Sequence, residues 1–364
     1  MNPYVSVMSL KEVWILGAAG RSGRAVAEAL VGRQMVPVLV GRNEAALRAL
    51  AEKVGGSARV VVATSIEEIG AELRKSGPAV VFNTIGPFAA TAVAVIRASA
   101  PGSHYCDLAN ELPAAIDVLA LNDEMASSGR CVVTGAGFGV LATESLVLKL
   151  CEGRPPAERV RVAAIPFVDA PGLIGPTLAA TIIDGIPAGA SRYENGRLVR
   201  VGFGADAEVL TLPDGSKVST AGVPTGDMEA ARRASGARFA VSASSMAPSG
   251  LLIRAFMPFF AWVLSWRAAR ELVKRRVAAI RVGKAKGPPK PSWTHARVEW
   301  TGGKVREGWL RAGDAMDFTT YVATEVAFRL AQDDCRPGAY TPGALFDADL
   351  AVAAGGTFLL DEAR

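Results

Sequence analysis

Three glycines spaced by three, Gly17, Gly20 and Gly23, directly follow a short apolar run at residues 13–16. Glycine tolerates the positive φ of a sharp strand-to-helix turn, and its missing Cβ lets a phosphate approach the backbone. The helix start offers unpaired N–H groups and the positive end of its dipole. The pattern is looser than the usual G-x-G-x-x-G fingerprint, and a turn without ligand is the alternative. We predict a pyrophosphate site made by Gly17, Ala19, Gly20, Arg21, Ser22 and Gly23.

Arg42 follows a second apolar run, at residues 35–40, about 20 residues beyond the glycine turn. An acidic residue at this position would bind the ribose hydroxyls of NAD, whereas a guanidinium can bind a 2′-phosphate and stack on adenine. Arg21 could place a second positive charge near the same phosphate. The sequence therefore predicts NADP(H) as the cofactor, with a solvated surface arginine as the alternative for Arg42.

The carboxyl ends of the next apolar runs supply the remaining cofactor contacts. Thr64-Ser65 follows the run at 58–63 and could reach the adenine, and the loop at 86–88 follows the run at 79–85 and should face the nicotinamide. Asn83 and Phe88 could shape the nicotinamide pocket through amide hydrogen bonds and ring packing. The residues assigned to the cofactor beyond the glycine turn are Arg42, Asn43, Thr64, Ser65, Asn83, Ile85, Gly86, Pro87, Phe88 and Gly137.

A proton donor should lie near the end of the run at 103–108, where Tyr105, Asp107 and Glu111 are the candidates. Each has a structural alternative: Asp107 could cap the turn, and Glu111 could pair with a basic neighbour. No Tyr-x-x-x-Lys pair occurs in the chain, which argues against the short-chain dehydrogenase mechanism, and no hydrolase elbow is found. His104 is expected to be a packed strand residue.

Apolar runs alternate with helix-forming segments from residue 13 to residue 139, with helices expected at 44–54, 66–75, 89–99 and 113–127. This alternation is typical of the Rossmann-type doubly wound parallel sheet of the α/β class. A strand at 159–167 should open a second, α+β domain with a mixed sheet. Turn signals at 213–215 and 301–303 predict hairpins there, and a long helix is expected at 314–332.

Several segments together resemble saccharopine dehydrogenase-like oxidoreductases. They are the glycine turn, the strand-end Gly41-Arg42, residues 83–88, 105–111 and 135–138, and Pro337-Gly338-Ala339-Tyr340-Thr341-Pro342-Gly343-Ala344 near the end. The resemblance implies an NADP-binding domain, an inserted mixed domain, and a substrate held between them. We expect the NADP-binding domain at 1–145 and the inserted substrate or dimerisation domain at 146–330. The C-terminal segment at 331–364, with its last strand, is expected to return to the NADP-binding domain.

Composition fits a folded globular protein: of 364 residues, half are hydrophobic and 21% are charged. The net charge of +5 is concentrated in residues 267–290, without a nucleic-acid module, so no nucleic-acid partner is expected. Two histidines and four scattered cysteines give no metal site and no disulfide framework. The first eleven residues lack a signal-peptide pattern, so we expect a cytoplasmic protein, and also a homodimer.

Residues 251–266 are almost wholly apolar, and the basic segment follows them directly. Between Trp262 and Arg281, apolar and basic side chains would take separate faces of a single helix. The segment is short for a membrane span and contains Arg254 and Pro258. Residues 251–290 could form a buried helix or dimer surface, a wall for an apolar substrate, or a peripheral membrane contact.

These patterns favour an NADPH-dependent reductase that transfers hydride to a C=C, C=N or C=O bond of a largely apolar small metabolite. Two other classes stay open: a non-catalytic NADP-binding regulator, and a membrane-peripheral scaffold. Cofactor binding separates the reductase from a protein without a dinucleotide site, and liposome co-sedimentation tests the membrane role.

Overall fold

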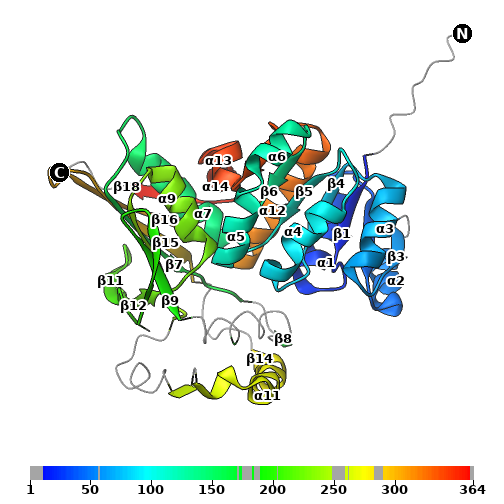
Figure 1. Cartoon of the computed structure of the whole chain (residues 1–364), viewed down its shortest axis with the longest axis horizontal. Coiled ribbons are helices and arrows are strands. Elements are labelled where there is room, and N and C mark those ends of the chain that lie inside the picture. Colours follow the sequence, from blue (N-terminus) through cyan, green and yellow to red (C-terminus); the bar gives the residue numbers. More distant parts are fainter. Residues whose placement is uncertain are drawn as a thin grey trace, which may run out of the picture.

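A computed structural model describes residues 11–55, 58–169, 172–173, 183, 189–202, 204–247, 259–260, 262–282 and 290–360. Two sheets lie side by side, each with its own helices, as Figure 1 shows with the first sheet at right and the second at left. We refer to each sheet with its helices as the first and second body.

The first sheet has seven strands, all parallel, in the order β17-β6-β5-β4-β1-β2-β3. Its strands are β1 (Val13–Leu16), β2 (Pro37–Gly41), β3 (Arg59–Val62), β4 (Val80–Asn83), β5 (His104–Asp107), β6 (Cys131–Val133) and β17 (Gly338–Tyr340). The strand order reverses between β1 and β4, and dinucleotides bind at this switch point in such sheets. The predicted doubly wound fold is confirmed.

Helices cover both faces of this sheet. They are α1 (Arg21–Gly32), α2 (Glu44–Lys53), α3 (Ile66–Ser76), α4 (Phe88–Ala98), α5 (Leu112–Leu119), α6 (Asn122–Ser127) and α12 (Ala315–Ala331). Val13 and Ile15 pack in the core that α1 and α12 share, whereas Trp14 and Leu16 pack in the core of α3 and α4. Because both faces are buried, the strands are apolar without alternation, which made them visible in the sequence.

One predicted helix, 113–127, is in fact two, because the chain turns at Ala120 and Leu121 between α5 and α6. The turn lets α5 pack against the second body while α6 packs against β17. The predicted helix at 314–332 is α12, which begins after the capping residue Asp314. It packs on the first sheet and on α1, although the predicted boundaries place it in the inserted domain.

The second sheet is mixed and has nine strands, with the main order β10-β9-β13-β7-β15-β16-β18 and with β11 and β12 attached through β13. They are β7 (Arg159–Ile165), β9 (Ala190–Glu194), β10 (Arg197–Val201), β11 (Glu208–Thr211), β12 (Lys217–Gly222), β13 (Phe239–Ser244), β15 (Ser292–Glu299), β16 (Val305–Ala312) and β18 (Thr357–Leu360). The helices α7 (Phe138–Cys151) and α9 (Gly226–Ser235) cover one face. Both predicted hairpins are present, as β11–β12 and β15–β16.

The end of the chain serves both sheets. After β17, the helices α13 (Pro342–Phe346) and α14 (Asp349–Ala353) lead to β18. The last strand was expected to return to the first domain, but β18 pairs with β16 at the edge of the second sheet. The turn at Gly355, with φ of 88°, and Gly356 directs the chain toward this edge, and Phe358 packs into the core there.

A smaller unit contains β8 (Gly172–Leu173), α11 (Arg267–Ala278) and β14 (Arg281–Val282), and lies below the second sheet in Figure 1. The predicted single helix through 262–280 is interrupted at Trp266, whose extended backbone precedes α11. Residues 251–258 and 283–289 of the predicted segment lie outside the described residues. Across the described ranges, no helix combines the length and apolar character needed to cross a membrane.

Candidate dinucleotide site

The glycine turn joins β1 to α1 at the switch point of the first sheet. Gly17 has φ of 77°, and the N–H groups of Gly17 and Ala18 both donate to the carbonyl of Val40, at 2.9 and 3.1 Å. Gly20 precedes α1 without a capping side chain. The backbone N–H groups of this first helical turn have no acceptor within the helix, and they carry the positive end of its dipole.

Close packing explains two of the three glycines. A Cβ on Gly23 would lie 2.7 Å from the Cα of Ala18, and a Cβ on Gly17 would lie 2.7 Å from Thr84 Oγ1. Gly20 is different, because it is exposed and a Cβ there would meet only the Gly17 carbonyl, at 3.1 Å. The outer glycines therefore seat α1 on the sheet, and Gly20 leaves the helix start accessible to an anion.

Arg42 and Asn43 follow β2, whose Val40 carbonyl holds the glycine turn. Arg42 is exposed, and it lies two residues from that anchor. Asn43 already has a structural function, because its Oδ1 accepts a hydrogen bond of 3.1 Å from the Ala46 N–H and caps α2. The cofactor contacts of Arg42 and Asn43 both stay predictions.

Thr64 and Ser65 also hold a helix start. Ser65 Oγ accepts from the Glu68 N–H at 3.2 Å, and Glu68 Oε2 accepts from the Thr64 N–H at 2.7 Å and from its hydroxyl at 2.9 Å. These hydrogen bonds, led by the Thr64 N–H, lower the pKa of Glu68. The arrangement is a capping box whose donor is displaced by one residue, because Glu68 accepts from the Thr64 N–H and not from the N–H of the N-cap Ser65. An adenine contact through Thr64 or Ser65 stays a prediction.

The loop after β4 is positioned by Asn83, which is fully buried. Asn83 Oδ1 accepts from the Ile85 N–H at 2.9 Å, and its Nδ2 donates to the Tyr105 hydroxyl at 3.1 Å. Thr84 Oγ1 donates to the Leu16 carbonyl at 2.7 Å, which fixes the loop against β1. Residues 84–88 therefore lie beside the glycine turn, at the edge where the nicotinamide is expected. Asn83 acts there through the backbone of the loop.

Tyr105 and Asp107, two of the three candidate acids, are 0% exposed. The Tyr105 hydroxyl donates to Asp107 Oδ2 at 2.9 Å, and Asp107 Oδ1 accepts from Ala109 N, Gly135 N and Thr134 Oγ1 at 2.9 to 3.0 Å. Burial raises the pKa of both groups. In this conformation neither side chain can touch a substrate, and Asp107 ties the ends of β5 and β6 together.

Glu111, the third candidate, is partly exposed and binds the start of α4. Its two carboxylate oxygens accept from the Phe88 N–H at 3.2 Å and from the Ala89 N–H at 2.8 Å. The same segment contacts the second body, because Glu111 forms a β-bridge with Thr225 and the Asn110 carbonyl accepts from the Gly226 N–H at 3.0 Å. Glu111 therefore lies where the loop at residues 84–88 and the start of α4 meet the second body.

Gly137 packs against α12. A Cβ on Gly137 would lie 3.3 Å from Thr319 Cγ2, and Thr319 Oγ1 accepts from the Phe138 N–H at 3.0 Å. The packing of α12 beside Gly137 could not be predicted, because the two segments are far apart in the chain.

Two buried carboxylates were not anticipated. Glu144 on α7 accepts a hydrogen bond from the Thr341 hydroxyl and another, of 2.9 Å, from the Gly343 N–H, and burial raises its pKa to about 7. Asp227 is 1% exposed at the start of α9, and its Oδ1 has no hydrogen-bond partner among the described residues. For Glu144 the sequence signal is Thr341-Pro342. This pair predicts a helix start, whose hydroxyl and N–H groups need an acceptor.

A cavity of about 630 Å³ opens between the start of α12 and the end of β16. Phe167 and charged residues of both signs line it. The charged residues are Asp169, Lys290, Arg311, Asp314 and Asp317. Thr319, which meets Gly137, lies about one turn further along α12. The charges of this cavity favour a ligand with polar groups, whereas the sequence predicts a largely apolar substrate.

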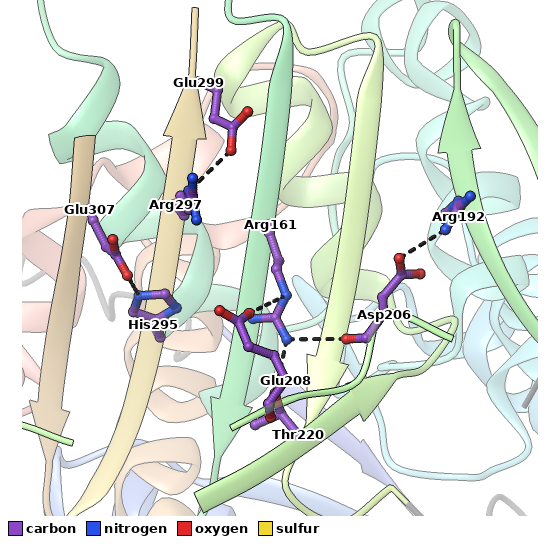
Figure 2. Close-up of polar contacts among 9 residues, drawn as sticks. All are labelled: Arg161, Arg192, Asp206, Glu208, Thr220, His295, Arg297, Glu299 and Glu307. Carbon is purple, nitrogen blue, oxygen red and sulfur yellow. Dashed lines mark hydrogen bonds and ion pairs between the residues drawn. The ribbon is translucent and has the colours of Figure 1, made fainter. Parts of the chain in front are cut away.

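The other face of the second sheet carries a polar network, drawn in Figure 2. Arg161 on β7 pairs with Glu208 at 3.1 Å and donates to Thr220 Oγ1 at 2.9 Å. His295 on β15 pairs with Glu307 on β16 at 2.6 Å. The first set fastens the β11–β12 hairpin to the sheet, so Arg161 serves the fold of the second body.

Known proteins were compared at the levels of sequence and structure. No family model matches the chain, and no curated protein matches it. Among solved structures, apo saccharopine dehydrogenase (L-Glu forming) from Saccharomyces cerevisiae aligns over 96% of this chain and 99% of its own, with a TM-score of 0.60 and 12% sequence identity. The chain has a saccharopine dehydrogenase-like fold. Serine dehydrogenase from Escherichia coli aligns over 34% of this chain and 80% of its own, with a TM-score of 0.30 and 14% identity.

Proposed function

We propose that this protein is an NADP(H)-dependent oxidoreductase of the saccharopine dehydrogenase-like type. The observation that carries the proposal is the uncapped, exposed start of α1 at the switch point, with Arg42 on the neighbouring strand end. The residues fit a dinucleotide, because the helix start suits a pyrophosphate and a guanidinium suits a 2′-phosphate. The overall likeness to saccharopine dehydrogenase supports it further.

A bound nicotinamide would supply or accept the hydride. The chain's own residues would orient it: Asn83 and Thr84 hold the 84–88 loop, and Glu111 fixes the start of α4 beside it. The bond reduced would be a C=C, C=N or C=O of a small metabolite held between the two bodies. The charged cavity supports a substrate with polar groups, and a largely apolar substrate stays a prediction.

A non-catalytic NADP-binding regulator is the second candidate. The burial of Tyr105 and Asp107 favours it, because it leaves Glu111 as the partly exposed member of the three predicted acids. Such a protein would bind NADPH and would not oxidise it with any carbonyl, imine or enoyl compound in a broad panel. The homodimer and the cytoplasmic location stay predictions under either function.

Cofactor preference tests the proposal directly. We expect NADPH to bind more tightly than NADH, as measured by nucleotide fluorescence, and Arg42→Ser to weaken NADPH binding by at least ~10-fold with little effect on NADH. Arg197→Ser, at an exposed position on β10, is the matched control and should change neither affinity. Equal affinities for the two nucleotides, or an Arg42→Ser variant that binds like the parent, would overturn the assignment of NADP(H).

A further inference from the structure

The segment around α11 exposes large aromatic side chains. Phe259, Phe260, Trp262 and Trp266 are each 52% to 58% exposed. Their rings contact one another: Trp262 lies 4.8 Å from Trp266 and 6.0 Å from Phe259 between ring centroids. Soluble proteins rarely expose a contiguous apolar patch of this kind unless something binds it.

Basic residues follow immediately. Between residues 259 and 282 the chain has six basic residues, Arg267, Arg270, Lys274, Arg275, Arg276 and Arg281, against the single acid Glu271. This excess equals the net charge of +5 of the entire chain, so the remainder is balanced. The helix α11 buries none of its residues, and Leu272 on it is also exposed. We define the aromatic–basic surface by its exposed aromatic and basic side chains: Phe259, Phe260, Trp262, Trp266, Arg267, Arg275 and Arg276.

We propose that the aromatic–basic surface docks this protein on an anionic lipid bilayer. Tryptophan and phenylalanine partition into the interfacial region, where the long stems of arginine reach the headgroups. Each basic residue gains from the negative surface potential of such a membrane. Since no described helix is long and apolar enough to span a bilayer, the contact would be peripheral.

The charge decides against a second copy of the chain as the occupant. An isologous dimer through this patch would bring two identical, strongly positive surfaces together, and like charges across an interface are unfavourable. The exposed aromatic cluster distinguishes the surface from a purely electrostatic site for nucleic acid, whose affinity comes mainly from phosphate contacts.

The test uses the full chain and vesicles of phosphatidylcholine with or without phosphatidylglycerol. We expect co-sedimentation with the anionic vesicles, weakened by salt, and a blue shift of tryptophan emission on binding. The double variants Trp262→Ser/Trp266→Ser and Arg275→Glu/Arg276→Glu should each bind at least ~10-fold more weakly. The control Val209→Ser/Arg197→Glu alters an exposed apolar residue and an exposed arginine of the second body, and should bind like the parent.

Circular dichroism checks that each variant is folded. NADPH affinity should be the same in the parent and the variants, so its measurement keeps this proposal separate from the proposed function. No difference between the two vesicle types, or undiminished binding by both double variants, would overturn it. So would tryptophan-dependent self-association in sedimentation velocity without vesicles, or a preference for single-stranded nucleic acid over anionic lipid.

Discussion

The thiol of Cys335 lies beside an imidazole and a second thiol. His104 Nδ1 accepts from the Cys131 N–H at 2.9 Å, so the remaining ring proton is on Nε2, which lies 4.0 Å from Cys335 Sγ and 3.2 Å from Asp333 Oδ1. Hydrogen bonds from the Cys131 thiol and from His104 lower the pKa of Cys335 to about 5. Cys335 is half-buried, and its lowered pKa favours the thiolate over the neutral thiol.

We predict that Cys335 is the cysteine that reacts fastest with iodoacetamide at pH 7. Burial raises the pKa of Cys151 to about 11, and burial also raises the pKa of Cys106. Peptide mass spectrometry should show labelling of Cys335 at least ~10-fold faster than labelling of Cys151 in the folded protein. Equal labelling rates for Cys335 and Cys151 in the folded protein would contradict the predicted thiolate.

Glu144 should make stability depend on pH. Its pKa is about 7 in the folded protein, against an ordinary value of 4.5, so between these values the folded protein holds a proton that the unfolded chain has lost. The contribution of Glu144 to the free energy of unfolding is therefore present below pH 4.5 and falls as the pH rises to about 7. Urea unfolding should show this slope in the parent and a flatter profile in Glu144→Gln.

The exposed Glu52→Gln on α2 is the control for that series and should keep the parent's slope. Parallel pH profiles for the parent and Glu144→Gln would show that the carboxyl does not titrate in this range.

At the scale of elements, Glu111 links α4 to the rest of the site. Because its carboxylate accepts from two N–H groups at the start of α4, Glu111→Ala should lower the free energy of unfolding by about 1 kcal/mol. Chemical denaturation measures this, with Glu52→Ala at an exposed helix position as the control. If Glu111→Ala were as stable as Glu52→Ala, the capping function of Glu111 would be wrong.

The elements that could be predicted are those with a local signal. The strands β1, β2 and β4 are buried on both faces and therefore read as apolar runs, and Pro213-Asp214-Gly215 marks the β11–β12 turn. The three-residue strand β17 has no such run, and its place beside β6 depends on contacts far away in sequence.

The prediction of the site is limited in the same way, because contacts between residues far apart in the chain leave no local sequence pattern. The glycine turn is a local pattern, so its place at the switch point could be predicted. The burial of Asp107 could not, since its partners Thr134 and Gly135 come from the next strand. Glu144 and Thr341 are almost two hundred residues apart. Thr341-Pro342 indicates the helix start, but no local pattern identifies Glu144 as its acceptor.

At the scale of the whole molecule, one core runs through both bodies. α12 packs on the first sheet, and Leu310 and Ala312 of β16 belong to the same buried cluster. The first and second bodies therefore share a buried cluster, and the division into domains stays a prediction.

We predict that a chain ending at Gly356, which lacks β18, loses about 2–4 kcal/mol of stability and self-associates. Phe358 would leave the core, and the edge of β16 would be open to pairing with another chain. A chain ending at Leu360 keeps β18 and is the control. Denaturation and light scattering should separate the two, and equal behaviour would show that β18 adds little.

The path of the C-terminal chain also has a consequence for biosynthesis. Residues 338–360 supply an edge strand to each sheet, and they are the last of the described residues to leave the ribosome. Neither sheet can be completed before these residues have left the ribosome. Both bodies would therefore stay incomplete until residues 338–360 emerge, and chaperones that bind unfinished sheet edges would have access to them until then.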